Sequence, residues 1–280
     1  EQYVIAMQEV PEAQGTLRPD RLFVAEPPAV LASYGVVAEP GRDPVTGGDA
    51  AWVGEEDREV LEAAGLEVLA PATLVAFHLD AVVRRKAKSL VGIQEVQSML
   101  DQLERAYPAL VRNVVPKPVS LALLTDVLRR LVDEGVSIRP LREILESLAT
   151  FAPHERDPVT LTELVRMGLQ AQITHRYMEA GGIAAYVLDD EIEEAIADAI
   201  QREPGGSYLA LPKHVAKEMV EAIKHETQPE LGPAVLITRK PGIRRFTRRL
   251  IETDLPDLHV VARGELKPEA PIDVLASVRM

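Results

Sequence analysis

The sequence predicts an α+β protein of several subdomains, and three changes of pattern along the chain predict it. Residues 20–71 interleave short apolar runs with Gly- and Pro-rich loops, residues 72–171 repeat apolar side chains at helical spacing, and residues 173–280 alternate strands with helices. The 280 residues correspond to about two domains by length. We therefore expect a small α+β module, an all-helical block and an α/β sandwich of the split βαβ kind.

The first 71 residues predict short strands separated by loops. Residues 3–7 form an apolar run typical of a strand already under way where the sequence starts, so we expect the sequence to be a fragment. Loops are common positions for binding residues, which makes this region a candidate binding module. The other expected elements are strands at 22–25, 51–53 and 66–69 and a helix at 55–64 that ends at Gly65.

The middle of the chain predicts a series of amphipathic helices, at 72–90, at 93–107 and in three further segments within 120–169. Ser120 and Asp157 suit helix N-caps, and Gly135 suits the left-handed residue that ends a helix. Pro140 is expected in a first helical turn, where its missing N–H costs nothing. Because the connections are short, consecutive helices should pack on one another.

The last third predicts alternating strands and helices. An acidic run at 189–194 begins a helix, where the helix dipole favours anions. A basic cluster is interpreted as a solvated helix face, with contact to an acidic partner surface as the alternative; it comprises Arg239, Lys240, Arg244, Arg245, Arg248 and Arg249. The expected strands are 183–188, 234–238, 259–262 and 272–278, and the expected helices are 191–200, 212–226 and 243–253, with a loop at 204–206.

Composition and motifs disfavour several classes of function. A net charge of −13 disfavours nucleic-acid binding, and the absence of cysteine excludes disulfides and thiolate sites. His214 and Glu218 have a spacing that can hold a metal, but no third ligand accompanies them and a solvated helix face explains them better. No apolar run reaches the roughly 20 residues of a membrane span, and no phosphate-loop or nucleophile motif occurs. We expect no catalytic residue, cofactor or metal.

Residues 135–148 also allow a helix-turn-helix interpretation, that of a DNA-binding regulator. The second helix would present Arg139, Arg142, Glu143 and Glu146. Mixed charge on an acidic protein is unsuited to contacts with phosphates, so this alternative is disfavoured.

Several sequence blocks resemble one family, the export-gate proteins of type III secretion systems, which flagella and virulence injectisomes share. The blocks follow one another in the family's order and extend over nearly the whole chain. They include P-A-T-L-V-A-F-H-L at 71–79, Q-E-V-Q-S-M-L-D at 94–101, G-V-S-I-R-P-L-R-E-I-L-E-S-L-A-T-F-A-P at 135–153 and L-P-D-L-H-V-V at 255–261.

The resemblance implies the C-terminal cytoplasmic part of such a protein, without its N-terminal membrane helices. It implies four subdomains: a split first one at 1–19 and 72–90, a second at 20–71, a helical third at 91–171 and an α/β fourth at 172–280. It also implies a ring of nine copies at the cytoplasmic face of the inner membrane, formed mainly by the third subdomain. That ring would dock chaperone–substrate complexes, a gatekeeper protein and the stalk of the export ATPase, without catalysis.

In a ring, each subunit contacts identical neighbours head to tail, and the mixed charge at 139–146 could then form contacts between subunits. Opposite charges on one surface can pair with the complementary surface of the next copy. We therefore place the ring interface at Arg139, Arg142, Glu143 and Glu146.

In the flagellar branch, the resemblance implies that chaperones bind a cleft between the first two subdomains, through a D-P-x-F turn and a Thr on the following helix. Here the turn reads Asp43-Pro44-Val45-Thr46, and the Thr position holds Phe77. The aromatic has moved across the cleft, which favours the injectisome branch. We place the cleft at Asp43, Thr46, Phe77 and Leu74; the alternative for Phe77 is an ordinary core position on an amphipathic helix.

The alternative function is that of a purely structural scaffold, which would share the fold without binding chaperones.

Overall fold

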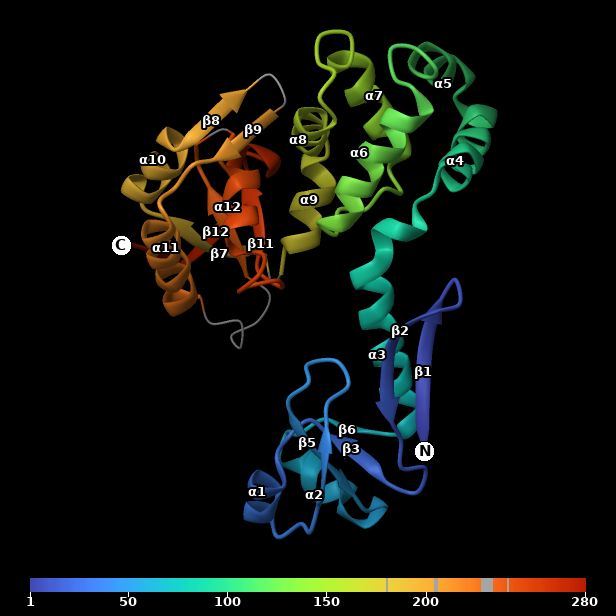
Figure 1. The fold of residues 1–280 in the computed structure, drawn as a ribbon, viewed down its shortest axis with the longest axis vertical. Helices are drawn as coiled ribbons and strands as arrows, with labels where there is room; N and C mark the ends of the chain where they lie inside the picture. The colour runs from blue at the N-terminus through green and yellow to red at the C-terminus, as the bar shows by residue number, and fades with distance from the viewer. Residues whose placement is uncertain (180, 204–205, 228–233, 241) are drawn as a thin grey trace. The chain divides into compact units, whose positions relative to one another are not determined.

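The structure is a computed structural model that describes residues 1–179, 181–203, 206–227, 234–240 and 242–280 (Figure 1). It divides into two compact units, residues 1–90 and residues 91–280. Among the described residues, no helix is long and apolar enough to cross a membrane. The mixture of helices and strands confirms the predicted α+β class.

The first unit contains a β-hairpin that packs on a long helix. The hairpin consists of β1 (Gln2–Met7) and β2 (Val10–Thr16), and the helix is α3 (Pro71–Lys86), which η3 (Ala87–Leu90) continues. The Tyr3 hydroxyl lies 2.7 Å from Nδ1 of His78, and Lys86 forms an ion pair of 2.6 Å with Glu12. The sequence predicted one strand before residue 20, and the structure has two. These contacts join residues 1–19 to residues 72–90, as a split subdomain requires, while the division into four subdomains stays a prediction.

A four-stranded antiparallel sheet, in the order β4-β5-β3-β6, forms the rest of this unit. One face of the sheet packs apolar side chains against the short helices, and the other face packs Phe23, Ala50 and Trp52 against Leu74 of α3. The elements are β3 (Leu22–Val24), α1 (Pro28–Leu31), η1 (Ala32–Tyr34), β4 (Glu39–Arg42), β5 (Asp49–Val53), η2 (Glu55–Asp57), α2 (Arg58–Ala63) and β6 (Val68–Leu69). The edge strand β4 was not predicted, because Pro40 and Gly41 disfavour a strand locally.

The second unit begins with six helices whose boundaries follow the predicted caps. Ser120 accepts a hydrogen bond from the backbone N–H of Leu123, Asp157 accepts one from Thr160, and Gly135 is left-handed with φ of +68°. Pro140 precedes its helix as the N-cap and is not in the first turn. The helices are α4 (Ile93–Ala106), α5 (Pro108–Val114), α6 (Leu121–Asp133), α7 (Leu141–Phe151), α8 (Pro158–Gly168) and α9 (Gln170–Tyr177). The spacing of apolar residues did not predict α5 or α9 as separate helices.

A parallel sheet in the order β11-β10-β7-β12 completes the second unit. Strands Ile200–Glu203 and Gly206–Leu209 pair as a hairpin, which the sequence did not predict. The sequence predicted only a loop at 204–206, and residues 204 and 205 lie outside the described residues. The elements are β7 (Ile183–Leu188), α10 (Asp190–Asp198), β8 (Ile200–Glu203), β9 (Gly206–Leu209), α11 (Lys213–Glu226), β10 (Val235–Thr238), α12 (Arg244–Ile251), β11 (His259–Ala262), η5 (Arg263–Glu265) and β12 (Ile272–Val278).

Both faces of this parallel sheet are buried, as parallel sheets require (Figure 1). Alternate residues along each strand point to opposite faces. Leu236 of β10 packs toward α10, α11 and α12, whereas Val235 and Ile237 join the core of the helical block, which includes Leu161 and Ile173. The helical block and the sheet therefore share one hydrophobic core.

A buried ionic cluster reinforces that shared core. It consists of Arg166 and Glu163 on α8, Arg244 on α12, Glu265 on η5 and Glu134 at the end of α6. Both Arg side chains and Glu265 are at most 2% exposed. The guanidinium of Arg166 donates two hydrogen bonds of 2.8 and 2.7 Å to Glu265 and one of 3.0 Å to Glu134. Nε of Arg244 donates to Glu163 at 2.8 Å, and its Nη2 donates to Glu134 at 3.1 Å.

The structure corrects the interpretation of the basic residues as a solvated helix face for Arg244 and Arg248, whereas Arg249 is exposed as predicted. Arg244 is buried, and Arg248 donates hydrogen bonds to the carbonyls of Leu255, Pro256 and Leu258. Burial alone would raise the pKa of Glu134, but the cations of Arg244 and Arg166 hold it below its ordinary value. The acidic run also has a structural use, because buried Glu193 accepts hydrogen bonds from the backbone N–H groups of Arg239 and Lys240.

The ionic cluster predicts a large stability effect. Replacing Arg244 by Met leaves Glu134 and Glu163 without their main cation, so the free energy of unfolding should fall by about 3–5 kcal/mol. The matched control is Arg142→Met, which removes the exposed pair of Arg142 with Glu146 and should leave the unfolding free energy nearly unchanged. Urea denaturation of both variants at pH 7 measures the difference. Equal losses would contradict a special role for the buried cluster.

His259, at the start of β11, predicts a pH effect. Its Nε2 lies 3.2 Å from Nη2 of Arg176, and burial together with Arg176, Arg248 and Arg166 lowers its pKa from 6.5 to about 4. The unfolded chain therefore takes up a proton first as the pH falls, so stability present above pH 6.5 is lost between pH 6.5 and 4. The loss attributable to this histidine should be about 2–3 kcal/mol.

Urea unfolding at pH values between 7 and 4.5 tests this effect. The variant His259→Gln should have a shallower dependence of unfolding free energy on pH, whereas the exposed control His154→Gln should follow the parent protein. A parent slope in His259→Gln would show that other groups cause the dependence.

Candidate binding cleft

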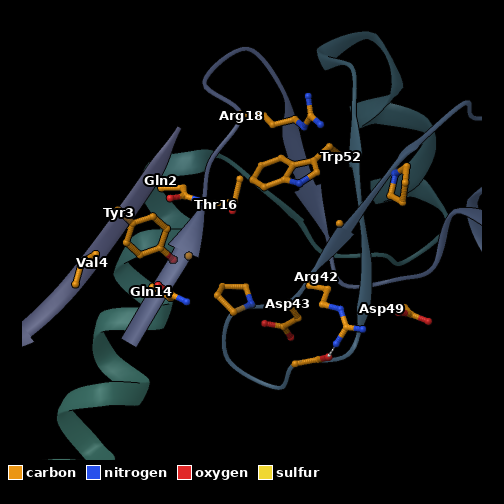
Figure 2. Close-up of a pocket in the computed structure, with 15 residues that line it drawn as sticks. Gln2, Tyr3, Val4, Gln14, Thr16, Arg18, Arg42, Asp43, Asp49 and Trp52 are labelled. Carbon is orange, nitrogen blue, oxygen red and sulfur yellow. Dashed lines mark hydrogen bonds between the residues drawn. The ribbon is translucent and has the colours of Figure 1, made fainter. Parts of the chain in front are cut away.

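The first unit contains an open cleft of about 790 Å³ between the hairpin and the sheet (Figure 2). The hairpin contributes one end of β1 and the opposing end of β2, and the sheet contributes β4, the loop that follows it, and β5. Its lining residues are Gln2, Tyr3, Val4, Gln14, Gly15, Thr16, Arg18, Pro40, Gly41, Arg42, Asp43, Pro44, Gly47, Asp49 and Trp52. The volume lies within the range of small-molecule and peptide sites.

On each wall of the cleft an aromatic ring lies across a glycine of the neighbouring strand. A Cβ atom at Gly15 would lie 2.4 Å from the Tyr3 ring, and one at Gly41 would lie 2.8 Å from Nε1 of Trp52. Trp52 is also packed edge-to-face on Phe23, with ring centroids 5.3 Å apart. The glycines therefore let both aromatic side chains lie close to the backbone, and any side chain there would displace a ring.

The hairpin wall carries a neutral hydrogen bond between Tyr3 and His78. Burial and the nearby charge of Asp43 raise the pKa of Tyr3. Burial and the charge of Arg85 lower the pKa of His78, against the opposing effect of Asp43. Both shifts favour the uncharged forms near neutral pH, so this wall offers polar atoms without a net charge.

The loop wall is organised by Asp43. Its carboxylate accepts hydrogen bonds of 2.8 Å from the backbone N–H of Val45 and from the hydroxyl of Thr46. The backbone N–H of Asp43 donates to the carbonyl of Gly48, which closes the turn. Asp43 therefore shapes the loop, and this role follows from the local preference of Asp for such turns.

The structure separates the residues that the sequence placed in the cleft. Asp43 lines it, and Thr46 is exposed in the loop where it bonds to Asp43. Leu74 is only 2% exposed and belongs to the core behind Trp52, so it supports the wall without being accessible. Phe77 is 47% exposed on α3, which contradicts the core alternative, but it is not among the lining residues. The aromatic lining comes from Tyr3, which is partly exposed, and from Trp52, which is only 3% exposed; the sequence pattern predicted neither.

The residues assigned to a ring interface lie on or just before α7. Arg139 and Arg142 are exposed, and Arg142 pairs with Glu146 at 2.8 Å and lies over the ring of Tyr107, with 4.9 Å between the guanidinium carbon and the ring centroid. Glu143 is partly buried. Their role in ring contacts stays a prediction. Among the described residues, no group of three His, Asp or Glu side chains is arranged to hold a metal.

The contact of Gly41 with Trp52 predicts a measurable change. Gly41→Ala should displace the indole of Trp52, the protein's one tryptophan, shift its fluorescence emission and lower the unfolding free energy by about 1–3 kcal/mol. The control Gly48→Ala lies in the loop between β4 and β5, where its added Cβ approaches the Thr46 hydroxyl at 3.3 Å. It should leave the emission unchanged. An unshifted spectrum in Gly41→Ala would contradict the packing described here.

Comparison with known proteins agrees with the resemblance seen in the sequence. The FHIPEP family profile matches residues 1–271. The low calcium response locus protein D of Yersinia pestis is 34% identical over 282 residues, which cover 99% of this chain and 40% of that protein. FlhA, the flagellar biosynthesis protein of Bacillus subtilis, is 31% identical and covers 84% of this chain and 35% of that protein. The chain thus spans about two fifths of the length of these relatives.

Solved structures share the fold over nearly the whole chain. The Chlamydia pneumoniae CdsV protein has a TM-score of 0.89 and 35% identity, and the match covers 99% of this chain and 80% of that chain. A cryo-EM structure of nonameric EPEC SctV-C has a TM-score of 0.79 and 28% identity, with coverage of 96% and 81%. Since the family profile matches all but the last nine residues, this chain belongs to the FHIPEP family, the export-gate proteins of type III secretion systems.

Proposed function

We propose that this chain is the cytoplasmic docking part of a type III secretion export gate, at the cytoplasmic face of the inner membrane. It receives chaperone–substrate complexes and a gatekeeper, and it contacts the stalk protein of the export ATPase. The observation that carries the proposal is the open cleft of the first unit, in a chain of this family. The cleft is open and bounded by polar backbone and by the partly exposed ring of Tyr3, with the largely buried Trp52 behind its sheet wall, which suits transient binding of a protein segment.

Assembly into a ring of nine copies is part of the same proposal. The EPEC SctV-C relative is nonameric in its solved structure, and another solved structure is of a CdsV and CdsO protein complex. In this chain, α7 presents charges of both signs near Tyr107, which suits a head-to-tail contact between copies. An isolated chain would form rings weakly, because attachment to a membrane normally concentrates such subunits.

The injectisome branch fits better than the flagellar branch. Thr46 stands where a flagellar chaperone site has Phe, and the exposed aromatic Phe77 stands on α3 instead. An exposed aromatic side chain is a common feature of protein-binding surfaces. Named relatives include proteins of both branches, among them the invasion protein InvA of Salmonella typhimurium.

The alternative is a structural scaffold that makes no transient contacts. Fluorescence or calorimetric titration of a purified chaperone–effector complex from the same bacterium against the chain distinguishes the two functions. Asp43→Ala should weaken binding about tenfold, because the loop wall loses the carboxylate that shapes it. Phe77→Ala should weaken binding several-fold by removing exposed apolar contact area on α3.

The control for this titration is Val37→Ala, which trims a side chain that is 89% exposed and does not line the cleft. Its affinity should equal that of the parent. Unchanged affinity in both Asp43→Ala and Phe77→Ala would overturn the cleft as the docking site. Absence of any binding by the parent chain would favour the scaffold.

A further inference from the structure

The edge strand β4 forms one side of the cleft, and among the described strands only β5 pairs with it. In the sheet order β4-β5-β3-β6 it pairs with β5 alone, and no other described strand covers its outer edge. Three of its residues, Pro40, Gly41 and Arg42, line the cleft. An uncovered edge of this kind presents unpaired backbone donors and acceptors.

The hydrogen-bond register shows which groups point outward. The backbone N–H of Asp43 donates to the carbonyl of Gly48 at 3.0 Å, so Asp43 bonds toward β5. Because backbone groups alternate along a strand, Arg42 and Pro40 direct theirs away from β5. Pro40 fits this assignment, since an outward position does not require an N–H. The edge therefore offers the N–H and carbonyl of Arg42 and the carbonyl of Pro40.

The opposite wall faces this edge across the cleft of about 790 Å³. It is formed by the β1–β2 hairpin, which carries Tyr3 and Gln14 (Figure 2), and the Tyr3 ring lies across Gly15. On the sheet wall, Arg42 and Asp49 lie opposite each other across the β4–β5 pair, yet the nearest interaction of the Arg42 guanidinium is a 3.4 Å hydrogen bond to the carbonyl of Gly47. Both charged groups thus remain available to side chains of a bound segment.

We propose that the docked chaperone–substrate complex presents an extended segment that adds to β4 as a fifth strand of this sheet. The inference rests on the proposed docking function and specifies how the partner is held. The backbone of the segment bonds to Arg42 and Pro40, and every second side chain of the segment faces the cleft beside the Tyr3 ring. Backbone pairing tolerates many sequences, so one edge can receive segments of different composition.

Hydrogen exchange of individual backbone amides tests strand addition without any mutation. The purified chaperone–effector complex used for the titration is added to the ¹⁵N-labelled chain, and the exchange rate of the Arg42 amide is followed by NMR. Strand addition predicts at least tenfold slower exchange of the Arg42 amide, with little change at the amide of Asp43, which is already bonded to Gly48. Binding that leaves the Arg42 amide unprotected would overturn the inference and would indicate docking of another kind, such as a helix.

A pair of substitutions at one position provides the second test. Arg42→Pro removes the outward N–H and leaves the bonds to β5 intact, whereas Arg42→Ala removes only the side chain. Arg42→Pro should weaken binding at least tenfold, and Arg42→Ala by less than threefold. Equal effects would overturn strand addition in favour of a side-chain contact.

Circular dichroism and Trp52 emission verify that both variants are folded. If Arg42→Pro does not fold, the exchange measurement on the parent chain alone tests strand addition.

The two tests separate strand addition from the docking function on which it rests. Loss of binding in Asp43→Ala combined with an unprotected Arg42 amide would retain the docking cleft and overturn strand addition. Failure of the parent chain to bind overturns both.

Discussion

The interaction on which the second unit depends is the buried cluster of two arginines and three glutamates. Its members come from the end of α6, from α8, from α12 and from η5, and hydrogen-bonded partners within it are up to 110 residues apart in sequence. Removing such charges from water is costly, and the geometry offsets that cost only when every member is in place. The cluster therefore requires the helical block and the parallel sheet to keep one arrangement, and their common hydrophobic core adds to the same constraint.

The first unit is built differently. Its sheet has one face covered by short helices and the other only partly covered by α3, and beside that second face lies the cleft. The walls of the cleft combine backbone, glycine and the Tyr3 ring with the charged side chains of Arg18, Arg42, Asp43 and Asp49. A surface of this kind suits binding of segments that differ in sequence, because the contacts it offers are mainly to the backbone.

Local rules were sufficient for much of this structure. Ser120, Gly135 and Asp157 end or begin helices as expected, and the apolar spacing predicted α3, α4, α6, α7 and α8 as well as the strands of the parallel sheet. The local rules failed where pairing between distant strands overrides the local preference of the residues. Strand β4 contains Pro40 and Gly41 and exists only because β5 pairs with it, and β2 contains a proline and a glycine and exists only because of β1.

The sequence by itself determined the helical punctuation, the α+β class and, through ordered blocks of residues, the family. Those properties depend on side chains within a few positions of each other or on matches that need no coordinates. Tertiary structure alone decided that Arg244 is buried and not solvated, that Leu74 lies behind the cleft and that Tyr3 and Trp52 line it. The physical reason is that burial and pairing depend on which distant elements pack together, and a guanidinium has the same local pattern whether it faces water or a carboxylate 81 residues away.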